Sequence, residues 1–381
     1  MPGPSTRSRH RPRLLALDRW SVVSALMVLA VVGLYVYDVA FVEHYLVAQW
    51  RWSPTRSDWL FVGSLVVLWL IAGLPSVRHP EQTRGRWHRL RARPGALAAL
   101  AVIVVVFVFG TVGPAFIDPP KIHFLRAFQP PAFTSTDATP LSSCVGAQSG
   151  GRCYGTLRFP LGTNGYGNGV LYLIVVGARV TTYVAVVTAA LVVPLGGTVG
   201  ALAGYYGGAV DAALMGYVDV QQTIPAVVLY ILAILVVGQG LFLLLLVFGL
   251  FSWGGIARIV RSEVMHVRNE EYVLSGRALG GPDWYLLRRH VLPNVSHSVV
   301  PSLAHQIAIL LLTQAALAFL DLGDIDQVSW GRSIAAGLGG DLPMLTQWWV
   351  ALFPALALAL TVVAVKVVGD HVRDVLDPRG A

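Results

Sequence analysis

The residues that could perform catalysis form no recognisable constellation in this sequence. A phosphate-binding loop needs the pattern Gly-x-x-x-x-Gly-Lys followed by Ser or Thr. The only lysines are Lys121 and Lys366, and they follow Pro120 and Val365. The His-Glu-x-x-His zinc pattern and the Gly-x-Ser-x-Gly nucleophile motif are also missing from the sequence. We therefore predict that this chain carries no catalytic residues, no metal site and no cofactor of its own.

The segment most suggestive of a binding function runs from Arg258 to Asn294 and mixes charged with apolar residues. Its first part suits a helix, because the spacing of Val273, Gly276 and Leu279 places them on one side. Two consecutive glycines, 280–281, should break that helix.

A second short helix is expected after this break. Pro282 suits its first turn, and the helix should run to about His290. Leu292 and Pro293 are then expected to stop it before the next apolar run. Such a helix-turn-helix is too short to fold alone, so its apolar side must be buried against something.

The composition indicates which kind of structure positions this segment. The 381 residues are 55% hydrophobic and 13% charged, whereas soluble globular chains are about 25% charged. Mean hydropathy is +0.64. A membrane-spanning helix needs about 20 apolar residues. Runs without Asp, Glu, Lys or Arg cover Trp20–Tyr37, Trp59–Val77, Pro94–Ile117, Val180–Val210, Val220–Ala257, His290–Leu320 and Leu342–Val365. The chain is therefore predicted to be an all-α polytopic membrane protein.

Eight membrane helices are expected. The run Val220–Ala257 has 38 residues and is too long for one crossing, so Gly238–Gly240 is expected to break it. The first run could instead belong to a signal peptide, but no small-residue cleavage site follows it, which favours a retained helix. The expected helices are 20–39, 58–76, 95–116, 174–203, 213–237, 240–258, 299–320 and 345–367.

Loop charges predict the orientation, because cytoplasmic loops carry an excess of Lys and Arg. With the N-terminus inside, the cytoplasmic segments are 1–19, 77–94, 204–212, 259–298 and 368–381. With the adjoining Arg258 and Lys366 they hold 20 of the 28 basic residues, against 8 in the rest of the chain. Both termini are therefore expected in the cytoplasm. Because the arginines lie beside apolar runs, we expect no nucleic-acid partner.

The longest outer segment, Asp118–Pro160, is rich in Pro, Ser, Thr and Gly and is predicted to be a loop domain. It contains the only two cysteines, Cys144 and Cys153. On an oxidising exterior these could form a disulfide; two free thiols are the alternative.

The expected spans offer little for ion coupling. Ion-coupled carriers usually keep charged groups inside their membrane helices, but no Asp or Glu lies in the interior of these spans. His305 is the one titratable residue well inside a predicted helix, and we expect it to be packed and hydrogen-bonded rather than part of a proton relay. A transporter built on this chain would take its energy from another subunit or act passively.

The cytoplasmic segment resembles a known family. Gly280, followed after nine residues by His290-Val291-Leu292-Pro293, is similar to the cytoplasmic loop of permease subunits of ATP-binding-cassette (ABC) importers. Arg277-Ala278-Leu279-Gly280 and Arg289-His290-Val291-Leu292-Pro293-Asn294 resemble the second, C-type permease of dipeptide, oligopeptide and nickel importers. The family's Glu-Ala-Ala is replaced by Leu274-Ser275-Gly276, so a salt bridge from that Glu is lost.

The resemblance covers about 95–381 and implies a type I ABC importer transmembrane fold. We expect an N-terminal extension, 1–94, with two helices and an Arg-rich linker, and a six-helix core, 95–381, with the outer loop 118–160 and the coupling loop 259–298. Further matching stretches are Leu161–Thr163, Gly177–Arg179, Gly204–Asp211, Val218–Asp219, Ile224–Pro225, Phe319–Gly323, Trp330–Gly331, Trp349–Pro354, Gly369–Asp370 and Leu376–Arg379. Asn164 and Asn168–Gly169 depart from charged family positions.

In such permeases the loop docks a short coupling helix into a cleft of a partner ATPase. The resemblance implies that ATP and Mg²⁺ are held by two ATPase subunits, beside a second homologous permease, an extracytoplasmic substrate-binding protein and membrane lipid. The expected location is a prokaryotic cell membrane. The expected coupling residues are Tyr272, Val273, Gly276, Arg277, Ala278, Leu279, Gly280, Pro282, His290, Leu292 and Pro293.

The resemblance favours import of short peptides; oligosaccharides, nickel or another small solute are open alternatives, and the sequence identifies no substrate-lining residues. An ion-coupled secondary transporter and a non-transporting scaffold are hypotheses from other classes. Small residues favour close helix contacts, and Gly196, Gly197, Gly200 and Gly204 could form one, either static or moving.

Overall fold

The computed structural model describes residues 19–42, 53–116, 120–137, 143–339 and 346–376. Within these ranges the chain is mostly helical, and one small three-stranded sheet is the only other extended regular element, which confirms the predicted class. The basic N-terminal stretch 1–18, the expected start of the last helix at 345 and the motif residues 377–379 lie outside the described residues.

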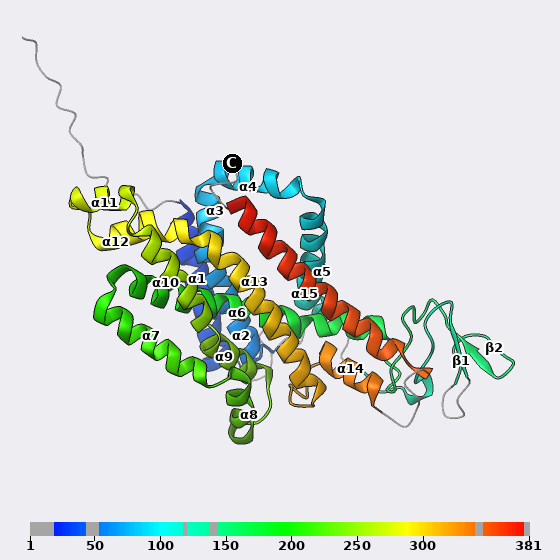
Figure 1. The fold of residues 1–381 in the computed structure, drawn as a ribbon. Coiled ribbons are helices and arrows are strands. Elements are labelled where there is room, and N and C mark those ends of the chain that lie inside the picture. Colours follow the sequence, from blue (N-terminus) through cyan, green and yellow to red (C-terminus); the bar gives the residue numbers. More distant parts are fainter. Residues whose placement is uncertain (1–18, 43–52, 117–119, 138–142, 340–345, 377–381) are drawn as a thin grey trace, which may run out of the picture.

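Seven described helices are long and apolar enough to cross a membrane, and a bent pair raises this number to eight. The eight predicted spans are therefore present (Figure 1). They are α1 (Arg19–Phe41), the continuous helix Arg56–Arg78 made of α2 (Arg56–Leu68), η2 (Trp69–Gly73) and α3 (Leu74–Arg78), α5 (Pro94–Phe116), α6 (Val170–Tyr206), α7 (Gly208–Thr223) with α8 (Ala226–Val237), α9 (Leu241–Phe251) with α10 (Gly254–Val267), α13 (Leu292–Phe319) and α15 (Trp349–Leu376).

The prediction of one continuous helix over 213–237 was wrong, because α7 ends at Thr223 and α8 begins at Ala226. The axes of α7 and α8 differ by 65°. Ile224, between them, is extended at φ −102° and ψ 114°. Proline disfavours helical conformation in the residue before it and cannot donate a backbone hydrogen bond, so Pro225 accounts for the bend. The break predicted at Gly238–Gly240 is confirmed, because α8 ends at Val237 and α9 begins at Leu241.

The predicted stop at Leu292 and Pro293 was also wrong. The helix runs on from α12 (Asp283–Leu286) through the π-helix η4 (Leu287–Val291) into α13, so that Asp283–Phe319 is one continuous rod. Pro293 lies in the first turn of α13, directly after the wider π turn. There the missing N–H of proline is tolerated.

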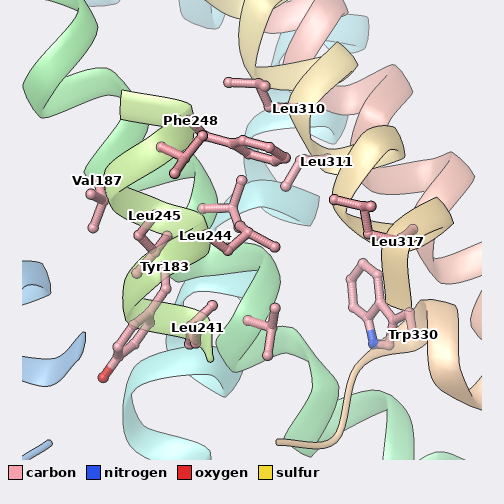
Figure 2. Close-up of a cluster of buried hydrophobic side chains, with 14 of the residues drawn as sticks. Tyr183, Val187, Leu241, Leu244, Leu245, Phe248, Leu310, Leu311, Leu317 and Trp330 are labelled. Carbon is pink, nitrogen blue, oxygen red and sulfur yellow. The ribbon is translucent and has the colours of Figure 1, made fainter. Parts of the chain in front are cut away.

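The largest apolar cluster joins α6, α9 and α13 with Trp330 of the short helix α14 (Trp330–Leu338). Figure 2 shows Phe248 and Leu311 facing each other across it, while the hydroxyl of Tyr183 points away. The indole of Trp330 donates a hydrogen bond to the carbonyl of Ile174, at 2.9 Å. Most of this cluster is contributed by helices that the charge-free runs predicted.

A second contact brings α6 against α10 through glycines. A Cβ atom on Gly200 would lie 2.3 Å from the carbonyl oxygen of Ala257, and one on Gly204 would lie 2.6 Å from that of Arg261. Gly196 is similarly tight, but a Cβ atom on Gly197 would meet no heavy atom within 4 Å. Three of the four predicted glycines therefore make the close contact and Gly197 does not.

The segment Asp118–Pro160, predicted to be an outer loop domain, is not only a loop. Its strands β1 (Ser135–Asp137), β3 (Arg152–Tyr154) and β2 (Gln148–Ser149) form an antiparallel sheet in the order β1-β3-β2, and Cys144 is disulfide-bonded to Cys153. The indole of Trp349 donates to the carbonyl of Thr163, at 3.0 Å, and so ties this region to α15. In Figure 1 the sheet lies at the end of the molecule opposite α11 (Glu271–Ala278) and α12.

The N-terminal helices dock on the core through a buried ion pair. Asp58, in the first turn of α2, is only 5% exposed. Its carboxylate lies 2.5 Å from the guanidinium of Arg179 on α6 and also accepts a hydrogen bond from Tyr183. The rings of Phe61 and Tyr183 stack with centroids 4.2 Å apart. The extension is thus packed against α6 rather than tethered loosely beside it.

Candidate functional site: the segment from Arg258 to Asn294

The predicted coupling segment folds as two helices joined by a tight turn, with one break that the sequence reading missed. Instead of one helix up to Leu279, α10 ends at Val267 and α11 begins at Glu271. The turn between them is closed by backbone hydrogen bonds from Asn269 to His266 and from Glu270 to Val267.

Gly280 ends α11 in a glycine C-cap. Its φ is +80°, and its N–H donates to the carbonyl of Arg277, while the N–H of Gly281 donates to that of Gly276. This pair of bonds is the Schellman arrangement, in which the residue with positive φ is usually glycine. The break that the two glycines predicted is confirmed, and the turn has a fixed shape rather than a flexible one.

The apolar residues of this segment divide into a buried and an exposed set. Val273, Leu286, Leu287 and Val291 are 5% exposed or less, and all but Leu286 join an apolar cluster that includes Tyr205 of α6. Val273 and Leu279 were expected on the same side, but Leu279 is 89% exposed. Because Val273 is covered by this chain, it supports a docking surface and cannot itself contact a partner.

Exposed apolar side chains gather at the turn and the start of α12. Trp284 is 67% exposed and Tyr285 is 52% exposed. With Leu279 they define what we call the docking surface. Exposed apolar residues of this size mark an interaction site when they lie together. The sequence reading did not select Trp284 or Tyr285, although an aromatic pair in a polar cytoplasmic segment was the available signal.

The other predicted residues surround this surface. Ala278, Gly280 and Pro282 are exposed, and Leu292 and Pro293 are exposed in the first turn of α13. Gly276 is half-buried, and a Cβ atom there would lie 2.8 Å from Leu286. A side chain at position 276 would therefore push α11 away from α12.

An aromatic group closes the base of the surface. The ring centroid of half-buried His290 lies 6.3 Å from that of Tyr272 and 5.8 Å from that of Tyr285. Asn294 donates a hydrogen bond to the Tyr272 hydroxyl, at 3.1 Å. Burial, together with the charge of Glu270, raises the pKa of the Tyr272 phenol above its ordinary value.

The docking surface is fastened to the end of α6. The Tyr205 hydroxyl donates to a carboxylate oxygen of Asp283, at 2.8 Å, and the guanidinium carbon of Arg277 lies 5.3 Å from the Tyr205 ring centroid. The hydrogen-bonding interaction with Tyr205 raises the pKa of Arg277. Arg268 donates to the carbonyls of Gly204 and Tyr205, at 2.7 and 3.0 Å, which satisfies free acceptors at the helix end. None of these anchors except Arg277 was predicted.

Two other predicted features lie elsewhere. Cys144 and Cys153 are in the outer region, far along the chain from the docking surface. His305 is exposed on α13 and has no hydrogen-bond partner among the described residues, so the expectation of a packed, hydrogen-bonded histidine was wrong. In the part of the chain that the structure describes, no group of three or more His, Cys, Asp or Glu residues could hold a metal ion.

Comparison with known proteins places this geometry among transport components. Residues 196–380 match the family described as binding-protein-dependent transport system inner membrane component, and residues 81–131 match the N-terminal TM domain of oligopeptide transport permease C. The docking surface lies inside the first match.

Individual relatives extend the similarity over most of the chain. The chain is 30% identical over 295 residues to the oligopeptide transport system permease protein OppC of Bacillus subtilis (strain 168), covering 76% of this chain and 88% of that one. It is 29% identical over 307 residues to the dipeptide transport system permease protein DppC of the same organism, covering 80% and 88%. It is 32% identical over 220 residues to the glutathione transport system permease protein GsiD of Pectobacterium atrosepticum, covering 58% and 72%.

Proposed function

The chain belongs to the family of binding-protein-dependent transport system inner membrane components, and from this premise we propose that it is a permease subunit of an ABC importer for short peptides. The observation that carries the proposal is the docking surface, Leu279, Trp284 and Tyr285, held rigidly on the ends of membrane helices. Such a surface suits a partner that pushes on it. The partner we propose is an ATPase subunit that binds ATP and Mg²⁺.

The proposed lever is the rod that begins at Asp283. Because α12, η4 and α13 are continuous, a displacement of Trp284 is transmitted along the whole membrane-spanning helix. The bond from Tyr205 to Asp283 carries the same displacement to α6. Closure of two ATPase subunits would thus rock this chain against a second, homologous permease and alternate access to a path between them.

Short peptides are proposed as the transported solute because the relatives are named for peptide transport. Two of them are named for dipeptides and oligopeptides and a third for glutathione, itself a short peptide. These names favour peptides over oligosaccharides or nickel. An ion-coupled carrier has no support in these comparisons.

The proposed membrane topology follows from the proposed ATPase partner. The chain is a multi-pass membrane protein. We place the docking surface and both termini in the cytoplasm, where ATP is available. The disulfide-bonded sheet at the opposite end then faces the exterior, where it would meet an extracytoplasmic substrate-binding protein.

Substitution of Gly280 tests the proposal. Gly280→Val forces a β-branched residue into a left-handed conformation, which costs about 1–3 kcal/mol of local strain, and it should distort the docking surface without blocking insertion. In proteoliposomes containing the full importer, we expect peptide uptake to fall at least tenfold while ATP hydrolysis continues uncoupled. Uptake and hydrolysis are measured on the same vesicles.

Gly238→Val is the matched control. Gly238 has φ +92° and, like Gly280, open space around it, but it lies in the α8–α9 turn. This variant should keep normal coupling. Normal coupling in Gly280→Val, or equal loss in both variants, would contradict the proposal.

A further inference from the structure

The linker between the extension and the core forms a basic helix at the ends of the membrane helices. Helix α4 spans Pro80–Arg91, and it begins two residues after the span that ends at Arg78 and ends three residues before Pro94, where α5 starts. Figure 1 shows α4 lying across the ends of α3, α5 and α15. Its position between two spans holds it at the membrane surface.

Helix α4 presents unneutralised positive charge. Arg84, Arg86, Arg89 and Arg91 are exposed and form no ion pair with the residues that the structure describes. The one acidic residue of the helix is Glu81, in its first turn. Four such guanidinium groups on twelve residues attract anions strongly, and guanidinium groups can bind phosphate in a bidentate manner.

An aromatic residue lies among these charges. Trp87 is 43% exposed, and its spacing from Arg84 and Arg91 places the three on one face of the helix. Tryptophan is enriched at the level of lipid headgroups because its ring is apolar and its N–H is polar. An indole flanked by guanidinium groups therefore suits an interface in which apolar chains and phosphates meet.

The helix is also held in place. Arg93, just after α4, forms an ion pair at 2.5 Å with Asp374 near the end of α15. At the other end, the Thr83 hydroxyl donates to the carbonyl of Ser76 at 2.9 Å. The contacts at both ends therefore fix the position of this basic helix in the fold.

We propose that the face of α4 formed by Arg84, Trp87 and Arg91, flanked by Arg86 and Arg89, binds the headgroups of anionic phospholipids. The charge of the helix, its position at the membrane surface and its exposed tryptophan favour a lipid over any other anion. This site is separate from the docking surface and does not depend on the transported solute. It would anchor the junction of extension and core to the acidic lipid of one leaflet.

The test measures lipid binding to the purified full chain. Phosphatidylglycerol and phosphatidylcholine with the same acyl chains are titrated into detergent-solubilised protein, and bound lipid is read by native mass spectrometry. Arg84→Gln/Arg91→Gln should weaken phosphatidylglycerol binding about tenfold or more, because each basic residue near an anionic surface contributes a several-fold gain. Phosphatidylcholine binding should not change, and excess inorganic phosphate should not displace the bound lipid.

Two further variants make the result decisive. Arg84→Lys/Arg91→Lys keeps the charge and should retain most of the binding, which excludes misfolding as the cause of a loss. Arg152→Gln/Arg158→Gln removes two outer arginines and should bind within twofold of the unaltered chain. Unchanged binding in the α4 glutamine variant, or equal loss in the outer control, overturns the proposal. Displacement of the bound lipid by inorganic phosphate would also overturn it and make α4 a free-anion site.

Discussion

The N-terminal and C-terminal parts of α6 are held in opposite ways. In its N-terminal third, Arg179 pairs with Asp58 where their side chains are 22% and 7% exposed. At its C-terminal end, Tyr205 bonds to Asp283 and lies under Arg277, both of which are exposed. The first connection is largely shielded from solvent, whereas the second is accessible to it. Helix α6 thus has a shielded joint with α2 and an accessible inner joint with α12, named for the proposed topology.

The largest effect is expected at the shielded joint. Asp58→Ala leaves the half-buried Arg179 charge without its partner, which should lower the free energy of unfolding by about 3 kcal/mol. Titration of the micelle-solubilised chain with sodium dodecyl sulfate measures this change. As a control, Asp219→Ala breaks the exposed pair with Arg258 and should cost less than about 1 kcal/mol. Similar losses in the two variants would remove the distinction between shielded and accessible ion pairs.

A smaller effect is expected where α6 approaches α10 near its inner end. Gly204→Val places side-chain atoms against the carbonyl of Arg261, and such overpacking should destabilise the chain by about 1–3 kcal/mol. Gly197→Val, on the same helix but facing open space, should have less than half that effect in the same titration. If the two substitutions were equivalent, the close α6–α10 contact would not contribute to stability.

The smallest effect is expected at the accessible joint itself. Tyr205→Phe removes the hydroxyl that bonds to Asp283 but keeps the ring under Arg277, so about 1 kcal/mol should be lost. Because the change is local, it should appear as roughly fivefold faster hydrogen exchange of the α12 amides with little change in global unfolding. Tyr206→Phe, whose hydroxyl has no hydrogen bond to the described residues, should leave exchange unaltered. Unchanged exchange in Tyr205→Phe would show that the inner joint does not hold α12.

Composition and glycine positions were enough to predict the membrane class, the eight spans and the two turns after residues 237 and 279. These features follow from local signals, because a run of apolar residues or a left-handed turn needs no distant partner. The errors have a common cause. Pro225 bends its helix, whereas Pro293 follows a π turn and leaves its helix unbroken. The surrounding packing determines which of these happens, and the local sequence does not show it.

The anchors of the candidate site were missed for a related reason. Asp58 and Arg179 are 121 positions apart, and Tyr205 and Asp283 are 78 apart. Nothing in the spacing of either pair marks it in advance. Likewise Val273 looks as apolar as Leu279, but only the packing of α11 into the cluster that includes Tyr205, Leu287 and Val291 decides that the first is covered and the second is exposed.

The distance along the chain between Asp58 and Arg179 has a consequence for biogenesis. A ribosome delivers the carboxylate well before the guanidinium that will neutralise it. Because Asp58 lies in the first turn of α2, it can stay hydrated at the membrane edge while the following helices are still being made. We expect α1 and α2 to insert into the bilayer first and to pack against α6 only after α6 has been synthesised and inserted.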